Sequence, residues 1–362
     1  MRILHVAGMD MGGIHVLIRE LTEHQVMKQH LKVGILIPTC KGINGVKEIA
    51  KEVNVYALKL KSWYDLSIKK YYRMYKIFKN YDIIHFHEFH PFYTICALLT
   101  GKKIIHTEHG TFQRRNLKIS IKKYIKKRVL GYFFLEHFYS AVVFNSNWLK
   151  EDVNLKTKKT YVIQNGTHFK GSPKITPKTG NTLNILTICR LVPRKRVDRL
   201  IRAVAKLDNL EGVCLHIVGG GPLSDELINL SKRLLQNDTY LFYGFQSDVS
   251  RFYDLADIFV LPAQFEPFGL VVVEAIRSGL ISICFSDSGG ALEIIQEVHE
   301  KLIAGDETEL AEHIQYWRDN REERLQITQK LNKRILEHFT VERMAEDYQR
   351  LYFEVLNDEA SK

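Results

Sequence analysis

The first half of the chain alternates short apolar runs, rich in β-branched residues, with longer segments whose apolar residues recur every three or four positions. The short runs predict buried strands, and the longer period predicts amphipathic helices. Strands that alternate with helices indicate βαβ units, in which helices cover both faces of a parallel sheet. The expected strands are Ile3–Ala7, Val33–Pro38, Val53–Ala57, Ile83–Phe86, Lys103–Thr107, Ala141–Phe144 and Tyr161–Ile163, and the expected helices include Gly13–Gln29 and Tyr64–Lys79.

The alternation stops at residues 168–182 (HFKGSPKITPKTGNT), which are rich in Gly, Pro, Lys and Thr and lack an apolar period. Such a composition is typical of a linker. The pattern then restarts, and beyond about residue 305 it is helical throughout. The sequence therefore predicts two α/β domains, residues 1–170 and 171–340. The second domain has expected strands Ile185–Ile188, Cys214–Val218, Tyr240–Tyr243, Ile258–Leu261 and Ile281–Phe285, and expected helices near Val197–Leu207, Leu223–Leu235 and Leu270–Ser278.

The charge of the chain is divided unevenly between these halves. Residues 1–180 hold 31 Lys and Arg against 12 Asp and Glu, whereas residues 181–362 hold 21 against 29. A basic half attracts nucleic acid, anionic lipid or phosphorylated substrates. We expect no nucleic-acid partner, because no recognition motif accompanies the charge. The chain has five scattered cysteines and no uninterrupted apolar run of about 18 residues, so we expect a cytoplasmic protein.

The basic charge is concentrated in Arg114–Arg128, which has eight basic residues and no acidic one. Apolar residues recur every fourth position from Leu117 to Phe133, which predicts a basic amphipathic helix that lies on anionic lipid. The alternative is that this stripe packs on the sheet while the lysines face water. The residues expected on the membrane or acceptor side are Lys118, Lys122, Lys123, Lys126 and Lys127.

Candidate ligand-binding residues follow the expected strands, where parallel sheets bind their ligands. Gly12 and Gly13 stand between the first strand and the first helix, where glycines let the backbone approach an anion. A tight turn explains this pair equally well. Arg190 and Lys195 follow the first strand of the second domain. Two cations there would suit a diphosphate leaving group, whose charge grows as its bond breaks.

Two carboxylates lie in the segment FEPFGLVVVEAIRSG: Glu266 in an expected loop and Glu274 inside an apolar helix. Carboxylates accept hydrogen bonds from vicinal sugar hydroxyls, and the helix start at Phe268–Leu270 offers backbone N–H groups.

Five histidines gather at two strand ends, namely His85, His87, His90, His106 and His109. The spacing H-x-H could suit zinc. No cysteine or carboxylate set converges with it in the sequence, so we expect no metal.

Several motifs together resemble one known family. They are the pair Arg190 and Lys195, the pair Glu266 and Glu274 eight residues apart, VGGGP at 218–222, DSGGALEII at 287–295, HTEHG at 106–110 and NGT at 165–167. This set is similar to the retaining glycosyltransferases of family 4 (glycosyl transferases group 1), which have the GT-B fold. The resemblance covers nearly the whole chain. It implies two Rossmann-like, doubly wound domains that face a central cleft, with a helix near residues 341–358 packed back on the first domain.

The resemblance also implies roles for residues. Arg190 and Lys195 would clamp the donor diphosphate, Glu266 would hold a hydroxyl of the donor sugar, and Glu274 would hold the ribose. His109 would bond the sugar near the reacting carbon, so that His109, Glu266, Arg190 and Lys195 form the catalytic set. The implied donor contacts are completed by Gly12, Gly13, Phe268, Gly269 and Leu270. No metal or other cofactor is implied. Two positions depart from the family pattern, His15 for a usual Glu and Arg196 for a usual Gly.

The expected function is transfer of a sugar from a nucleotide diphosphate donor, UDP by its frequency in the family, to a lipid-linked saccharide of a surface polysaccharide pathway. The expected location is peripheral, on the inner face of the cell membrane. One alternative is another enzyme of the same fold, a nucleotide-sugar epimerase or a disaccharide phosphorylase. Another is a non-catalytic donor-binding scaffold subunit. The sequence leaves open the sugar, the linkage, the acceptor and the oligomeric state.

Overall fold

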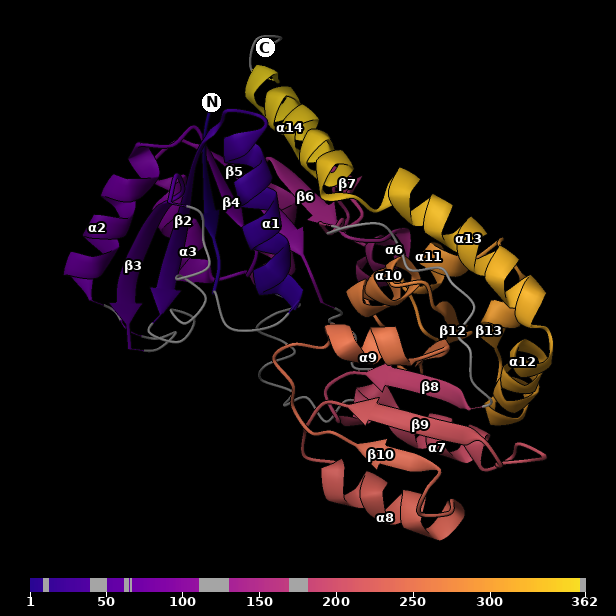
Figure 1. Ribbon diagram of the computed structural model, residues 1–362. Helices are drawn as coiled ribbons and strands as arrows, with labels where there is room; N and C mark the ends of the chain where they lie inside the picture. The colour runs from indigo at the N-terminus through magenta and orange to yellow at the C-terminus, as the bar shows by residue number, and fades with distance from the viewer. Residues whose placement is uncertain are drawn as a thin grey trace. The chain divides into compact units, whose positions relative to one another are not determined.

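The computed structural model describes residues 1–8, 13–39, 51–61, 65, 67–110, 130–168 and 182–358. The chain divides into two compact units (Figure 1). Unit 1 comprises Met1–His168 and Thr340–Lys362, and unit 2 comprises Phe169–Phe339. Most of the expected linker lies outside the described residues. Among the described helices, none combines the length and the apolar character that crossing a membrane requires.

The described strands of unit 1 form a parallel sheet in the order β3-β2-β1-β4-β5-β6-β7. The strands are β1 (Arg2–Val6), β2 (Lys32–Thr39), β3 (Asn54–Leu60), β4 (Ile83–Phe86), β5 (Lys103–Glu108), β6 (Ala141–Phe144) and β7 (Thr160–Val162). The helices are α1 (Gly13–Met27), α2 (Ile68–Lys79), α3 (Pro91–Leu98), α5 (Tyr132–Phe138), α6 (Asn147–Val153) and α14 (Val341–Asn357).

Helices cover both faces of this sheet, and successive side chains of a strand point to opposite faces. Neighbouring residues of one strand are therefore buried against different helices. Ile84 packs in a cluster with residues of α2, α3 and α6, whereas its neighbour Ile83 packs with residues of α1 and α14. Helix α14 completes the second face from the far end of the sequence, with Tyr348 and Tyr352 almost fully buried. This arrangement explains why the strands read as continuous apolar runs.

The described strands of unit 2 form a second parallel sheet, in the order β10-β9-β8-β11-β12-β13. The strands are β8 (Leu183–Ile188), β9 (Val213–Val218), β10 (Tyr240–Phe242), β11 (Ile258–Leu261), β12 (Ile281–Phe285) and β13 (Ile303–Ala304). The helices are α7 (Val197–Val204), α8 (Ser224–Leu234), α9 (Ser250–Leu255), α10 (Leu270–Arg277), α11 (Leu292–Ile295), α12 (Glu307–Asp319) and α13 (Arg321–His338), with 3-10 turns η3 (Pro193–Lys195) and η4 (Glu300–Leu302).

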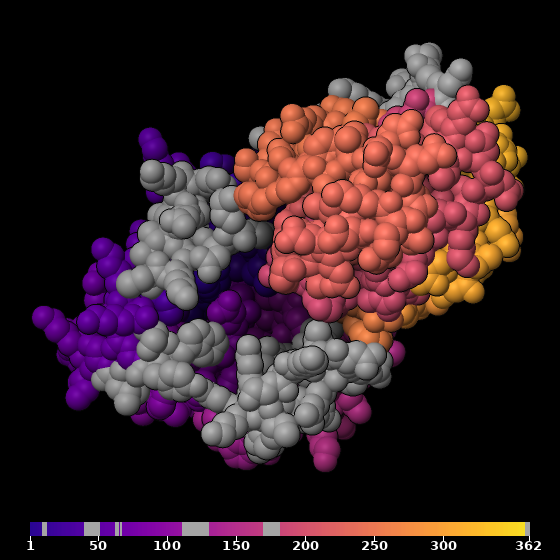
Figure 2. Space-filling view, turned by 90° about the horizontal axis from the view of Figure 1, so that it is seen from below, coloured from indigo at the N-terminus to yellow at the C-terminus, as the bar shows by residue number. Residues whose placement is uncertain are grey.

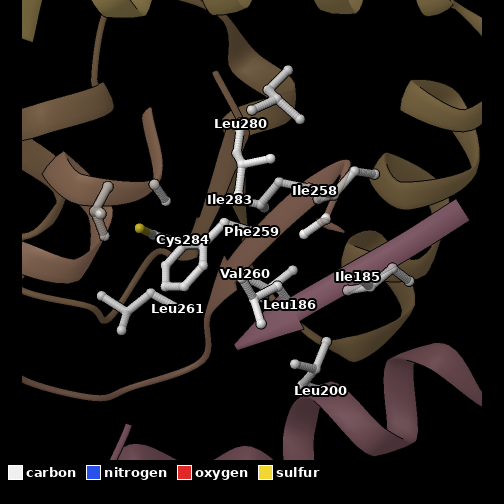
Figure 3. Packing of buried hydrophobic residues seen from close by; sticks show 14 of the residues in the cluster. Ile185, Leu186, Leu200, Ile258, Phe259, Val260, Leu261, Leu280, Ile283 and Cys284 are labelled. Atoms are coloured by element: carbon white, nitrogen blue, oxygen red, sulfur yellow. The ribbon is translucent and has the colours of Figure 1, made fainter. Parts of the chain in front are cut away.

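The core of unit 2 is built from the central strands, as Figure 3 shows for side chains of β8, β11 and β12 that pack together beside Leu200 of α7. In Figure 2 the surface of unit 2 that faces the viewer has the salmon and orange colours of α8, β10 and α9. Two parallel sheets, each covered by helices, confirm the predicted α/β fold class.

Candidate active site

The order of strands in unit 2 reverses direction at β8, since β9 and β10 lie on one side of it and β11 to β13 on the other. Ligands of open parallel sheets bind at the carboxyl ends of the strands beside such a switch point. Strands β8 and β11 are hydrogen-bonded neighbours, so the loops that follow them meet at one edge of the sheet. Arg190 and Lys195 are in the first loop, and Glu266 is in the second.

The carboxylate of Glu266 is held by two cations from the turn η3. Lys195 Nζ lies 2.6 Å from Glu266 Oε2, and Arg194 Nη1 lies 3.3 Å from the same oxygen. The three side chains are 12–24% exposed. Pro193 begins this turn, and a single turn of three residues brings both cations to the same carboxylate. The sequence indicated Lys195 and Glu266 as site residues but not Arg194, although the run Pro-Arg-Lys-Arg contained the signal.

The neighbouring cations keep the Glu266 carboxylate ionised although it is partly shielded from water. Burial on its own raises the pKa of this carboxyl, but the charges of Lys195, Arg194 and, more weakly, Arg190 outweigh it and lower the pKa below 4.5. Arg190 itself is exposed. Glu266 is therefore ionised at neutral pH, and the two cations in contact with this one carboxylate leave a net positive charge.

Backbone hydrogen bonds fix the Glu266 loop against the segment after β12. Glu266 forms a parallel bridge with Gly289, its N–H donates to Ser288 O at 3.1 Å, and its carbonyl accepts from Gly290 N at 2.8 Å. This segment is the start of the DSGG motif, which therefore positions the glutamate. Asp287 is itself paired with Arg199 of α7 at 2.8 Å.

The loop after β8 also requires glycines from the VGGGP motif. Gly219 has a φ of 135°, and a Cβ there would lie 1.9 Å from the carbonyl oxygen of Cys189. A Cβ on Gly221 would lie 2.4 Å from Leu191 O. Neither contact is possible for a larger residue. The two glycines therefore let the loop after β9 lie directly against the loop that carries Arg190.

Arg196, one of the two departures from the family pattern, has a left-handed backbone with a φ of 45°. This conformation favours glycine and costs an L-residue about 1 kcal/mol. Here Arg196 pairs with Asp198 through two hydrogen bonds of 3.1 Å, which hold the turn.

Helix α10 and the residues before it include the remaining residues that we expect on the donor side. Gly269 precedes it in the left-handed region with a φ of 92°, and Phe268 is buried. Leu270 is the first residue of the helix, where N–H groups have no partner within the helix. Glu274 is half-buried, and its Oε2 accepts a 2.8 Å hydrogen bond from Tyr253 OH, a contact that the sequence did not reveal.

In unit 1, His109 follows β5 and belongs to a buried polar network. The registers of β1, β4 and β5 place odd-numbered positions on the face covered by α1 and α14. Ile3 of β1 is paired with Ile83 of β4, and two positions nearer the carboxyl ends His5 is paired with His85, which is paired in turn with Ile105 of β5. Thr107 follows Ile105 on the same face, one step further towards the carboxyl end. His109 Nε2 lies 3.0 Å from His87 Nδ1.

The five histidines do not form one cluster. His106 is on the opposite face of the sheet, 3.5 Å from Glu108, and His90 stacks on Tyr93. His5, which sequence reasoning missed, joins His85 and His87 instead. Burial lowers the pKa of His5 and of His109 to about 4 and that of His85 and His87 well below 6.5. These four imidazoles are therefore neutral at pH 7.

One group in the described part of the chain has the spacing for a metal ion. One ring nitrogen from each of His5, His85 and His87 lies within 4.8 Å of the other two. All six nitrogens already take part in hydrogen bonds with neighbouring side chains, at 2.7–3.0 Å. The arrangement therefore fits a hydrogen-bonded network as it stands, and the expectation that no metal is needed stays a prediction.

Gly13, which begins α1, follows β1 as expected. Some expected site residues lie outside the described residues, namely Gly12, Lys118, Lys122, Lys123, Lys126 and Lys127.

The chain is similar in sequence to known glycosyltransferases and to a related synthase. The chain is 26% identical over 325 residues to N-acetyl-alpha-D-glucosaminyl L-malate synthase of Bacillus anthracis, which covers 85% of this chain and 84% of the relative. It is 26% identical over 162 residues to an O-antigen biosynthesis glycosyltransferase of Escherichia coli, 45% of this chain and 44% of the relative.

Among solved structures, Anabaena HepE in complex with UDP and glucose matches with a TM-score of 0.81 and 18% identity, over 98% of this chain and 100% of that one. This likeness shows that the fold is that of the GT-B glycosyltransferases. Two family models match adjacent parts of the sequence: Glycosyltransferase Family 4 at residues 11–169 and Glycosyl transferases group 1 at residues 170–334. Because the two models together span most of the chain, the protein belongs to the family 4 type of glycosyltransferases.

Proposed function

We propose that this glycosyltransferase transfers a sugar from a nucleotide diphosphate donor, with UDP as the nucleotide, and retains the configuration at the sugar carbon. The observation that carries the donor proposal is the cluster of Arg190, Arg194 and Lys195 around the single carboxylate of Glu266. A diphosphate gains negative charge as it leaves the sugar, and fixed cations stabilise that charge without reorganising. The cations also supply what a divalent metal supplies elsewhere, so we propose a metal-independent reaction.

Calorimetric titration with UDP, GDP and ADP, with EDTA present, tests the donor proposal. We expect UDP to bind, and Arg190→Ala to weaken that binding about tenfold or more, because charge-assisted hydrogen bonds contribute about 1.5–3 kcal/mol. Arg202→Ala is the matched control, since Arg202 is an exposed arginine of the neighbouring helix α7. Unchanged affinity in Arg190→Ala would contradict the assignment. Consumption of donor without acceptor, or dependence on free phosphate, would favour the epimerase or phosphorylase.

For the acceptor, we propose a lipid-linked saccharide of surface polysaccharide synthesis, reached at an anionic membrane. The support in the described residues is the outer surface of α2, α3 and α5, which combines exposed apolar and basic side chains. The apolar ones are Ile68, Tyr72, Phe92, Ile95, Leu99, Phe133 and Phe138, and the basic ones on α2 are Lys69, Arg73, Lys76 and Lys79. Such a combination binds anionic lipid through both charge and buried apolar area.

Sedimentation with phosphatidylglycerol vesicles tests membrane association, with phosphatidylcholine vesicles as the neutral comparison. Changing Lys122, Lys123, Lys126 and Lys127 to Gln should release the protein from the anionic vesicles, and Leu99→Ser should weaken binding further. The control is the pair Lys232→Gln and Arg233→Gln, exposed cations at the end of α8 in unit 2. Equal binding by the quadruple variant and the wild type would count against membrane association.

A second candidate acceptor is a small hydroxy acid, because the relative from Bacillus anthracis is named as a synthase of a glucosaminyl L-malate. Supplying L-malate and an isolated lipid-linked saccharide in parallel, with UDP-N-acetylglucosamine as donor, distinguishes the two. The anomeric configuration of the product, read by proton NMR, tests retention in either case.

A further inference from the structure

Four side chains of unit 1 form an unbroken line of hydrogen bonds that ends at His109. Gln25 of α1 places Oε1 2.9 Å from His5 Nε2. His5 Nδ1 lies 2.9 Å from His87 Nε2, and His87 Nδ1 lies 3.0 Å from His109 Nε2. The first three members are at most 4% exposed.

Each imidazole in this line carries one proton, because burial keeps the rings neutral. A neutral imidazole donates through one nitrogen and accepts through the other. Every hydrogen bond in the line must therefore run in the same direction, and the group at one end decides which direction that is.

Gln25 decides it. Its amide oxygen faces His5, while its amide nitrogen faces Tyr352 OH at 3.5 Å. A carbonyl oxygen can only accept, so His5 carries its proton on Nε2 and accepts on Nδ1. His87 then donates from Nε2 to His5, and His109 donates from Nε2 to His87. Nδ1 of His109 is left without a proton.

We propose that Gln25, His5 and His87 are positioning residues that hold His109 in the tautomer protonated at Nε2, so that His109 Nδ1 accepts a hydrogen bond from a sugar hydroxyl of the substrate. The substrate half of this inference rests on the proposed function. A neutral acceptor selects a hydroxyl donor and gives no attraction to phosphate. Recognition of the diphosphate is then left to the cations of unit 2.

His85 provides a matched comparison within the same network. Its ring centroid lies 4.3 Å from that of His87, and it is fully buried. Its nitrogens contact Tyr352 OH at 2.8 Å and Thr107 Oγ1 at 2.7 Å. It therefore packs beside His87 without a hydrogen bond to any of the three imidazoles in the line, and it is joined to Gln25 only through Tyr352 OH.

The tautomer can be measured in the ligand-free protein by nitrogen-15 NMR of labelled histidines, with His109→Gln used to assign the signal. We expect the wild type to be protonated at Nε2 of His109. We expect His87→Phe to give a mixture of tautomers, His87→Gln to restore the wild-type state through its amide, and His85→Phe to leave it unchanged. A proton on Nδ1 in the wild type, or a wild-type signal in His87→Phe, would overturn the proposal. So would tight stoichiometric zinc binding that His87→Phe abolishes, because it would make these histidines metal ligands.

Kinetic measurements distinguish a role of His87 in setting the tautomer of His109 from a role in the stability of the fold alone. Loss of one neutral hydrogen bond to substrate should lower kcat/KM about tenfold in His87→Phe, with recovery in His87→Gln. The Kd for UDP alone should be unchanged in both variants, and a rise in this Kd that accompanies the fall in kcat/KM would overturn the positioning role. If the wild type transfers no sugar from any donor, the proposed function fails. Even then, the NMR result shows by itself whether Gln25, His5 and His87 set the tautomer of His109.

Discussion

Two groups of polar side chains occupy the same kind of place, the carboxyl ends of central parallel strands, one in each unit. In unit 2, Glu266 is half-buried and keeps its charge, because Lys195 and Arg194 contact it. In unit 1, the buried His5 and the half-buried His109 are uncharged and are satisfied by hydrogen bonds to Gln25 and His87.

The same force acts on both groups, since burial disfavours the charged form of any side chain. The two groups differ in the charged side chains that surround them. Two opposite charges within 3.3 Å of one oxygen outweigh burial at Glu266. At His109 the opposing charge of Glu108 does not overcome burial, and the pKa falls to about 4. One protein therefore contains a charged site suited to a diphosphate and a neutral site suited to hydroxyl groups.

The largest expected effect comes from breaking the charged site. Lys195→Met removes the cation 2.6 Å from Glu266 Oε2. We expect the transfer rate to fall about 100-fold or more, because a preorganised group at a developing charge contributes this much. Lys206→Met, which removes an exposed lysine of unit 2, should retain the wild-type rate. Steady-state assays at saturating donor compare the two, and a Lys195→Met enzyme as active as this control would refute the role of the cation.

Acid should weaken unit 1 through its neutral histidines. A histidine whose folded pKa is lowered contributes stability that is complete above the unfolded value near 6.5 and is lost as the pH falls towards 4. For His5 this contribution is on the order of 3 kcal/mol. We expect the protection of the β4 amides against hydrogen exchange, measured relative to their intrinsic exchange rate at each pH, to decrease as the pH falls between these two values, and His5→Phe to reduce this pH dependence.

Exchange of the β8 amides in unit 2 is the internal control for this experiment. The charges of Lys195 and Arg194 lower the pKa of Glu266, and His5 belongs to the other unit. The His5→Phe change should leave β8 exchange as it is in the wild type. An unchanged pH dependence at β4 in the variant would exclude His5 as a source of acid sensitivity.

The smallest effect should come from Tyr253→Phe, which removes the 2.8 Å hydrogen bond to Glu274. We expect UDP to bind about fivefold more weakly, because one hydrogen bond that orients a carboxylate contributes about 1 kcal/mol. Tyr240→Phe on β10 is the control, a half-buried tyrosine of the same unit. Calorimetry resolves a fivefold change, and equal affinities in both variants would remove Glu274 from the nucleotide site.

The pattern of apolar and polar residues was sufficient to predict many of the strands and helices. The strands predicted at Ile83–Phe86, Ala141–Phe144 and Ile258–Leu261 have the same bounds in the structure. Each is a run of four mostly apolar residues between polar segments, which is the length of a buried strand rather than of a helix. The expected helix Tyr64–Lys79 begins instead at Ile68, because an apolar period marks the packed turns of a helix better than its first residue.

The sequence by itself determined two α/β sheets and the motif residues that follow their strands, because these depend on patterns a few residues long. Tertiary structure decided which of those residues touch. Arg194 reaches Glu266 across 72 positions, and His5 reaches His87 across 82. Gln25 and Tyr352 meet across 327 positions, after α14 packs beside α1. The charge of Glu266 and the neutrality of the histidines are set by these long-range contacts, since a pKa depends on what surrounds a group in space and not on its neighbours along the chain.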